Sequence, residues 1–126
     1  MKPVEVLLVE DNAGDAVLMR QVMGESKIPV NLHIARDGEQ ALIILSDAQF
    51  QPDLIMISAG FDAHRDDPLA GLNFEAEDYG WITRALCALA QKHCVGRVVS
   101  ALEGGYDRDA LAASAGMHVE ALLKAA

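Results

Sequence analysis

The sequence predicts a flavodoxin-like α/β domain with three layers, in which a four-stranded parallel sheet lies between helices. Short apolar segments rich in β-branched residues alternate with longer segments whose apolar residues recur every three or four positions. Strict alternation of this kind favours a parallel sheet with a helix after each strand. The length of 126 residues fits a single domain, residues 1–126. Right-handed crossovers restrict the topology, and the strand order 2-1-3-4 is preferred.

The first part of the chain predicts two strand–helix units. Both strands are short apolar runs, as expected for strands buried on two faces. Each helix follows an Asn or Asp that can cap it, and its apolar side includes Leu18 and Val22 in the first helix and Leu42 and Leu45 in the second. In chain order, the elements are a strand over residues 4–9, a helix capped by Asn12, a strand over residues 30–35 and a helix capped by Asp37.

The second part predicts two more units of the same kind, separated by a long polar loop. The third helix repeats apolar residues at Tyr79, Ile82 and Leu86, and the fourth places Val119 on its inward side. Loops as long as residues 59–72 are usually functional or disordered. In chain order, the elements are a strand over residues 54–58, a helix capped by Asn73, a strand over residues 97–102, a tight turn at Glu103–Tyr106 and a helix beginning at Asp107.

Composition and charge exclude several classes of partner. The formal net charge is −9, from 19 acidic and 10 basic residues. A polyanion would be repelled at long range, so no nucleic-acid partner is expected. No apolar run approaches 18 residues and no signal peptide is recognisable, so we expect no membrane association and a cytoplasmic location.

Residues 1–46 resemble the start of a response-regulator receiver domain. The resemblance rests on three strings, Val4–Asn12, Gly14–Ala16 and Ala35–Leu42. It implies a magnesium ion held by an acidic pair, which Glu10 and Asp11 match, and by a phosphate-accepting aspartate at the end of the third strand. Serine occupies that last position and no matching lysine follows, so phosphoryl transfer is not expected.

Residues 47–126 resemble the C-terminal part of the histone deacetylase and acetoin-utilisation family. The strings Ser58–Leu69 and Leu102–Tyr106 carry this resemblance. It implies a zinc ion with two aspartates and one histidine, and a tyrosine that stabilises the oxyanion. Asp62 matches one zinc ligand and Tyr106 the tyrosine. The other two ligands and the family's adjacent histidine pair are not found, so Tyr106 is expected to be vestigial.

These two resemblances lead to the hypothesis of an engineered or recombined chimera, a de novo protein without catalytic activity, and not an enzyme. The expected join lies at Ser46–Gln51, where splicing disturbs a core least. The alternative is a receiver-like signalling or cation-binding module in which Glu10, Asp11 and Asp62 form an acidic rim. Oxygen ligands of this kind suit magnesium or calcium better than zinc. No other cofactor is expected.

The fourth strand suggests how the protein pairs with itself. Residues 97–102 are largely apolar, and in the order 2-1-3-4 they form an edge with unpaired N–H and C=O groups. We therefore expect a homodimer through this edge or its neighbouring helices. Polar loop residues capping the edge are the alternative.

Overall fold

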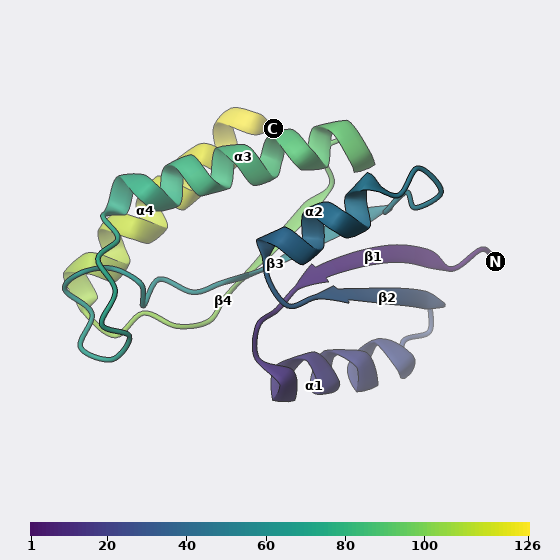
Figure 1. Ribbon diagram of the computed structural model, residues 1–126, viewed down its shortest axis with the longest axis horizontal. Helices are drawn as coiled ribbons and strands as arrows, with labels where there is room; N and C mark the ends of the chain where they lie inside the picture. The colour runs from purple at the N-terminus through teal and green to yellow at the C-terminus, as the bar shows by residue number, and fades with distance from the viewer.

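The computed structural model describes residues 1–126 as four strands and four helices in strict alternation. The strands form one parallel sheet of order β2-β1-β3-β4. Helix α1 lies on one side of the sheet, and α2 and α3 lie on the other (Figure 1). The predicted α/β class, three layers and strand order are confirmed. The elements are β1 (Val4–Val9), α1 (Ala13–Gly24), β2 (Val30–Ala35), α2 (Gly38–Ser46), β3 (Leu54–Ala59), α3 (Ala76–Cys94), β4 (Val98–Leu102) and α4 (Arg108–Ala125).

Two of the three predicted helix caps, Asn12 and Asp37, are confirmed, and Asp107, which was expected to begin the last helix, caps it instead. In each, a side-chain oxygen accepts a hydrogen bond from the backbone N–H three residues later, which satisfies one of the donors left free at a helix start. The capping residues are Asn12, Asp37 and Asp107.

Helix α3 begins later than the sequence suggests, so the prediction of a cap at Asn73 is wrong. Phe74 donates its N–H to the carbonyl of Ala63 at 2.9 Å, and it pairs with His64 in an isolated bridge. This contact holds the chain extended beyond Asn73. Glu75 then caps the helix in a reciprocal capping box with Asp78.

The sheet joins the two parts of the chain. Strand β1 pairs with β2 on one side and with β3 on the other, in a register that sets Val6 opposite Leu54 and Val9 opposite Ile57. Phe50, in the connection before β3, packs against a core cluster that includes Leu7. Residues 1–46 and 47–126 therefore share one sheet and contribute to one fold.

Three clusters of buried apolar residues lie on the side of the sheet that α2 and α3 cover. They centre on Leu7, Ile55 and Phe61, and each includes residues of these helices. Val6 and Leu8 alternate with Leu7 and are buried on the opposite face. Only 23 of 126 residues are buried, and none of them is in α1. The inward positions expected from periodicity are wrong at four residues, each at least half exposed: Leu18, Val22, Leu42 and Val119.

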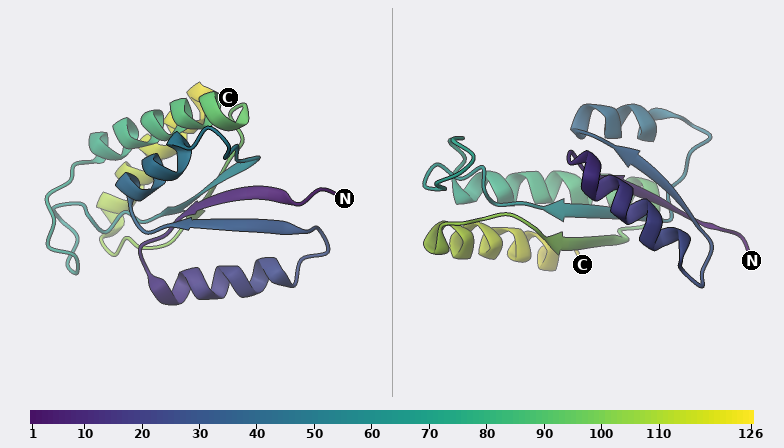
Figure 2. Two further views of the ribbon diagram at one scale, coloured as in Figure 1. Left: turned by 45° about the vertical axis from the view of Figure 1, so that its right-hand side comes forward. Right: turned by 90° about the horizontal axis from the view of Figure 1, so that it is seen from below.

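Helix α4 packs along α3 and reaches the edge strand β4 (Figure 2). Its buried positions are Ala110, Ser114, His118 and Ala121. The strand order leaves β4 at an edge of the sheet, as expected. None of the four helices is both long enough and apolar enough to cross a membrane.

Candidate active site and acidic rim

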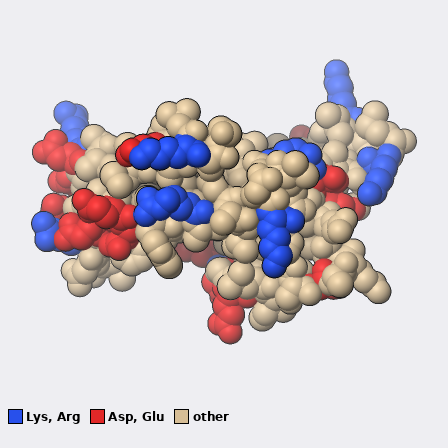
Figure 3. All heavy atoms as spheres, turned by 90° about the horizontal axis from the view of Figure 1, so that it is seen from above, with Lys and Arg blue, Asp and Glu red and all other residues tan.

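The carboxyl ends of the strands surround an open depression of about 1020 Å³. Parallel sheets place their functional sites at this edge. One basic side chain, Arg36, lines the depression. On the face seen in Figure 3, acidic side chains gather toward the left-hand end of the molecule, with a few basic ones among them. The carboxylates that line the depression are Asp11, Asp15, Asp37, Asp62 and Glu103.

The segment after β3 fixes the position of Asp62. Backbone bonds from Glu103 to Ala59 (2.9 Å) and from Phe61 to Gly104 (2.8 Å) continue the β3–β4 ladder beyond the strands. The Asp62 carboxyl then lies against Gly104, where an added Cβ would be 3.2 Å from its Cγ. Any side chain at this glycine would crowd the carboxylate. Glycine at position 104 therefore allows Asp62 to occupy the rim.

Tyr106 is placed by a buried carboxylate on the loop before α3. Asp67 accepts hydrogen bonds from the N–H groups of Tyr106 and Leu69, both at 2.9 Å. Burial opposes the charge on Asp67, but these N–H groups favour it, and its pKa is lowered. Gly105 has a φ of 139°, and an added Cβ would lie 2.9 Å from Leu111 Cδ1. The turn thus holds Tyr106, whose side chain is largely exposed, at the depression.

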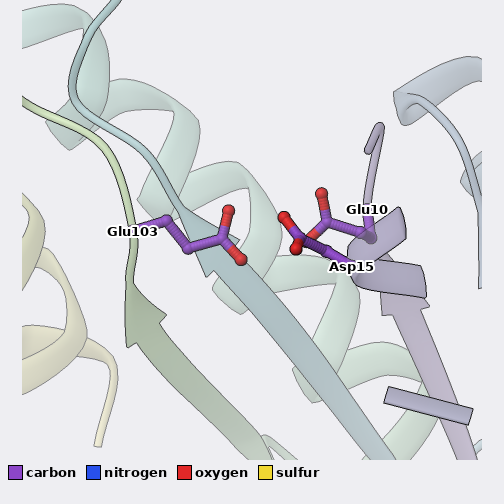
Figure 4. Close-up of side chains that lie close together, drawn as sticks. All are labelled: Glu10, Asp15 and Glu103. Carbon is purple, nitrogen blue, oxygen red and sulfur yellow. The ribbon is translucent and has the colours of Figure 1, made fainter. Parts of the chain in front are cut away.

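The residues predicted to hold a metal lie close to this depression. Asp11 and Asp62 line it, and Glu10 is buried beside it. That three-residue site stays a prediction. The structure brings together a different trio, Glu10, Asp15 and Glu103, whose candidate ligand oxygens all lie within 4.8 Å of one another. Figure 4 shows their carboxyl groups pointing toward one another.

Sequence reasoning missed Asp15 and Glu103. The sequence predicts Asp15 only as a residue near a helix start and Glu103 only as part of a tight turn. The available signal was that Asp15 lies in the first turn after β1 and Glu103 directly follows β4, at the same edge of the sheet. Strands β1 and β4 are separated only by β3 in the observed order.

The two glutamates of this trio influence each other, although Glu10 is buried and Glu103 is exposed. Loss of hydration around its carboxyl group raises the pKa of Glu103, and the Glu10 carboxyl beside it raises it further. Burial also opposes charge on Glu10, but the neighbouring Ser58 hydroxyl and the Asn12 N–H favour it, and the pKa of Glu10 is lowered. Two carboxyl groups at this separation strongly disfavour being charged together without a cation.

The histidines do not complete a zinc site with Asp62. The Nδ1 of His64 accepts a hydrogen bond from the Asp66 N–H, and His118 lies between Thr83 and Ser100. His33 contacts Glu5, and His93 lies in the last turn of α3. A catalytic zinc site takes three protein ligands. The donors around Asp62 therefore do not fit the two-aspartate, one-histidine set.

A second cavity, of about 280 Å³, lies behind the rim and is mostly apolar. Phe61, Phe74 and Tyr79 are among its lining residues, and Ser58 and Gly60 also line the acidic depression. The Tyr79 hydroxyl is buried without a hydrogen-bond partner. Burial, helped by the charge of Asp62, raises the pKa of Tyr79 to about 12, so this phenol stays neutral.

Comparison with known proteins decides the family. The sequence pattern described as "Histone deacetylase domain" matches residues 27–122. The chain belongs to the histone deacetylase domain family. It is 36% identical over 116 residues to type-2 histone deacetylase 2 of Dictyostelium discoideum, a match that covers 90% of this chain. It is 40% identical over 84 residues to the chloroplastic histone deacetylase 14 of Arabidopsis thaliana, which covers 67% of this chain.

Solved structures share the fold. The histone deacetylase Clr3 superposes with a TM-score of 0.65 at 18% identity and covers 98% of this chain. The HDA15 HD domain gives a TM-score of 0.61 at 22% identity, again over 98%. The chain spans 27% and 45% of those two chains, and 6% and 20% of the two relatives above. It therefore corresponds to part of a deacetylase fold.

These matches correct the hypothesis of a chimera. The family match begins at residue 27 and crosses the expected join at Ser46–Gln51, and the Dictyostelium match covers nine-tenths of the chain. The receiver resemblance of residues 1–46 was misleading because a buried strand followed by acidic residues suits the edge of any parallel sheet. The engineered or recombined origin and the signalling alternative are wrong.

The expectation that the protein is not an enzyme is also wrong. The family and its named relatives are deacetylases, which are hydrolases. The missing ligands of a familiar metal site do not exclude catalysis, because this chain spans only part of the deacetylases that it matches.

Proposed function

We propose that this chain belongs to an amide hydrolase of the deacetylase type and carries two of its catalytic residues, Asp62 and Tyr106. One observation carries the proposal. The two motifs that hold these residues are separated in sequence, yet the continued β3–β4 ladder brings both to one depression at the carboxyl edge of the sheet. The names of the relatives point to an acetylated amine as substrate.

The roles follow from the chemistry of the two side chains. Tyr106 is a phenol whose O–H can donate to a carbonyl oxygen that gains negative charge as water adds to the carbonyl carbon. Asp62 is an acceptor that can hold the attacking water by one of its hydrogens. The products are acetate and the free amine.

The charge of the rim favours a basic substrate. Five carboxylates and one arginine line the depression, and the net charge of the chain is −9. Such a surface attracts a cationic peptide and raises its rate of encounter. An acetyl-lysine flanked by lysine or arginine residues is therefore the preferred substrate class.

The test is acetate release from such a peptide by the purified full chain. We expect hydrolysis above the buffer rate, faster for the basic peptide than for one with glutamate flanks. Tyr106→Phe removes only the phenolic donor and should lower kcat by about 10²–10³, as loss of an oxyanion donor does. Asp62→Asn should also lower kcat strongly.

The matched control is Asp66→Asn. Asp66 lies on the same loop as Asp62, but it faces Arg65 and lines no part of the depression. Its activity should equal that of the unmodified chain. No acetate release above buffer, or equal rates for Tyr106→Phe and Asp66→Asn, would overturn the proposal.

A further inference from the structure

We propose that Glu10, Asp15 and Glu103 form a binding site for a hard divalent cation, distinct from the residues of the hydrolytic proposal. The three carboxyl groups come from separate elements: the end of β1, the first turn of α1 and the end of β4. Their ligand oxygens lie within 4.8 Å of one another. Figure 4 shows them converging from both sides of β3.

Glu10 supplies an independent reason to place a cation here. Its side chain is only 2% exposed. Oε1 accepts a hydrogen bond from the Asn12 N–H at 3.0 Å, whereas Oε2 is buried with no partner. A buried carboxylate oxygen without a partner is costly. A cation between Glu10 and the other two carboxylates supplies the missing interaction.

No protein cation performs this role. The ion pairs of the structure join other residues, and none includes Glu10, Asp15 or Glu103. Arg36 lines the same depression without pairing with any of the three. Three carboxylates in one place thus lack a counter-charge from the chain.

The donor set defines the class of cation. All three donors are carboxylate oxygens, and the neighbouring Ser58, which lines the same depression, offers a hydroxyl. Oxygen-only sites suit magnesium, manganese and calcium. The depression is open, so water molecules can fill the remaining coordination positions.

This site does not depend on the proposed hydrolysis. Its three ligands exclude Asp62 and Tyr106, so cation binding and acetate release can fail separately. It also differs from the site expected from the sequence, which shares only Glu10 with it. Asp11 and Asp62 therefore serve as matched carboxylate controls.

The experiment is isothermal titration calorimetry of the full chain with Mg²⁺, Mn²⁺ or Ca²⁺ alone. We expect one cation per chain. Glu103→Gln and Asp15→Asn should each weaken binding by about tenfold or more, since the number of charged ligands sets affinity. Asp11→Asn and Asp62→Asn should change it by less than about threefold. Both Glu103 and Asp15 are exposed, so these two variants should fold, which circular dichroism checks.

Two outcomes would overturn the site. One is the absence of binding heat with all three cations. The other is an affinity that falls as much in Asp62→Asn or Asp11→Asn as in Glu103→Gln, which would place the cation elsewhere on the rim. A Glu10→Gln variant that folds should lose binding, because the substitution replaces the charged carboxylate with a neutral amide.

Discussion

His118 is held as a neutral imidazole by hydroxyl groups of two other elements. Thr83 donates its only hydroxyl hydrogen to the Tyr79 carbonyl at 2.6 Å, so at 2.7 Å from His118 Nδ1 it acts as an acceptor. The hydrogen therefore lies on Nδ1, and Nε2 accepts from Ser100 at 2.8 Å. Burial lowers the pKa of His118, in keeping with this neutral form.

Replacing His118 by Gln should make unfolding easier and less dependent on pH. Loss of two buried hydrogen bonds is worth about 1–3 kcal/mol. Because the folded pKa of His118 lies below its unfolded value near 6.5, its contribution to stability is present above that value. This contribution is lost as the pH falls toward the folded pKa. His118→Gln has no such contribution, so its stability should fall less over the same pH range. Urea unfolding between about pH 7.5 and pH 5 measures the difference.

His93→Gln is the control for this pH dependence. His93 lies in the last turn of α3 and makes no side-chain hydrogen bond. The variant should follow the pH dependence of the unmodified chain. If His118→Gln showed the same slope as His93→Gln, the buried neutral histidine would not be the source.

At the residue scale, the sequence identified some parts of the candidate site and not others. Asp62 and Tyr106 follow from two local strings, and their neighbours in sequence explain their placement. The convergence of Glu10 with Glu103 depends on which strand lies between them and on the strand register. Neither the strand order nor the register can be predicted from a short stretch of sequence.

At the element scale, α1 differs from the other helices. Its cap and length match the sequence pattern, yet it has no buried residue, and Leu18 is 57% exposed. In α2, by contrast, Leu45 is 6% exposed and packs in the cluster around Leu7. The periodicity thus predicts where a helix forms and which of its sides is apolar. It does not predict how deeply that side is buried against the sheet.

Alanine substitution should separate these two helices. Leu18→Ala should change the free energy of unfolding by no more than about 0.5 kcal/mol, as exposed positions do. Leu45→Ala removes buried methyl groups from a packed cluster and should cost about 2–5 kcal/mol. Urea unfolding measures both. Similar losses at the two positions would show that α1 packs more tightly than the structure indicates.

The start of α3 shows a limit of local signals. Both Asn73 and Glu75 precede the apolar repeat, and by composition Asn73 is the better cap. The pairing of Phe74 with the loop after β3 decides between them. This is a tertiary contact between residues ten positions apart, and only the folded loop supplies it.

In the whole molecule, β1 is the central strand that connects the N-terminal part of the chain with the candidate site. It lies between β2 and β3, so the acidic end of β1 meets the motifs that follow β3 and β4 at one edge. The class and strand order were predictable because alternation and crossover handedness leave few topologies. That residues on both sides of the expected join belong to one family was not predictable, since many parallel sheets have a buried strand followed by acidic residues. The homodimer through β4 stays a prediction.

We expect residues 1–46 and 47–126 to unfold as one cooperative unit that carries a single functional edge. Native-state hydrogen exchange of the unmodified chain and of Leu7→Ala measures this cooperativity. Leu7 is 1% exposed in the central strand β1, and its truncation should cost about 2–5 kcal/mol. We predict that the most protected amides of α3 lose the same free energy of protection as those of β1. Unchanged protection in α3, with loss confined to residues 1–46, would mean that the two parts unfold separately and do not form one cooperative fold.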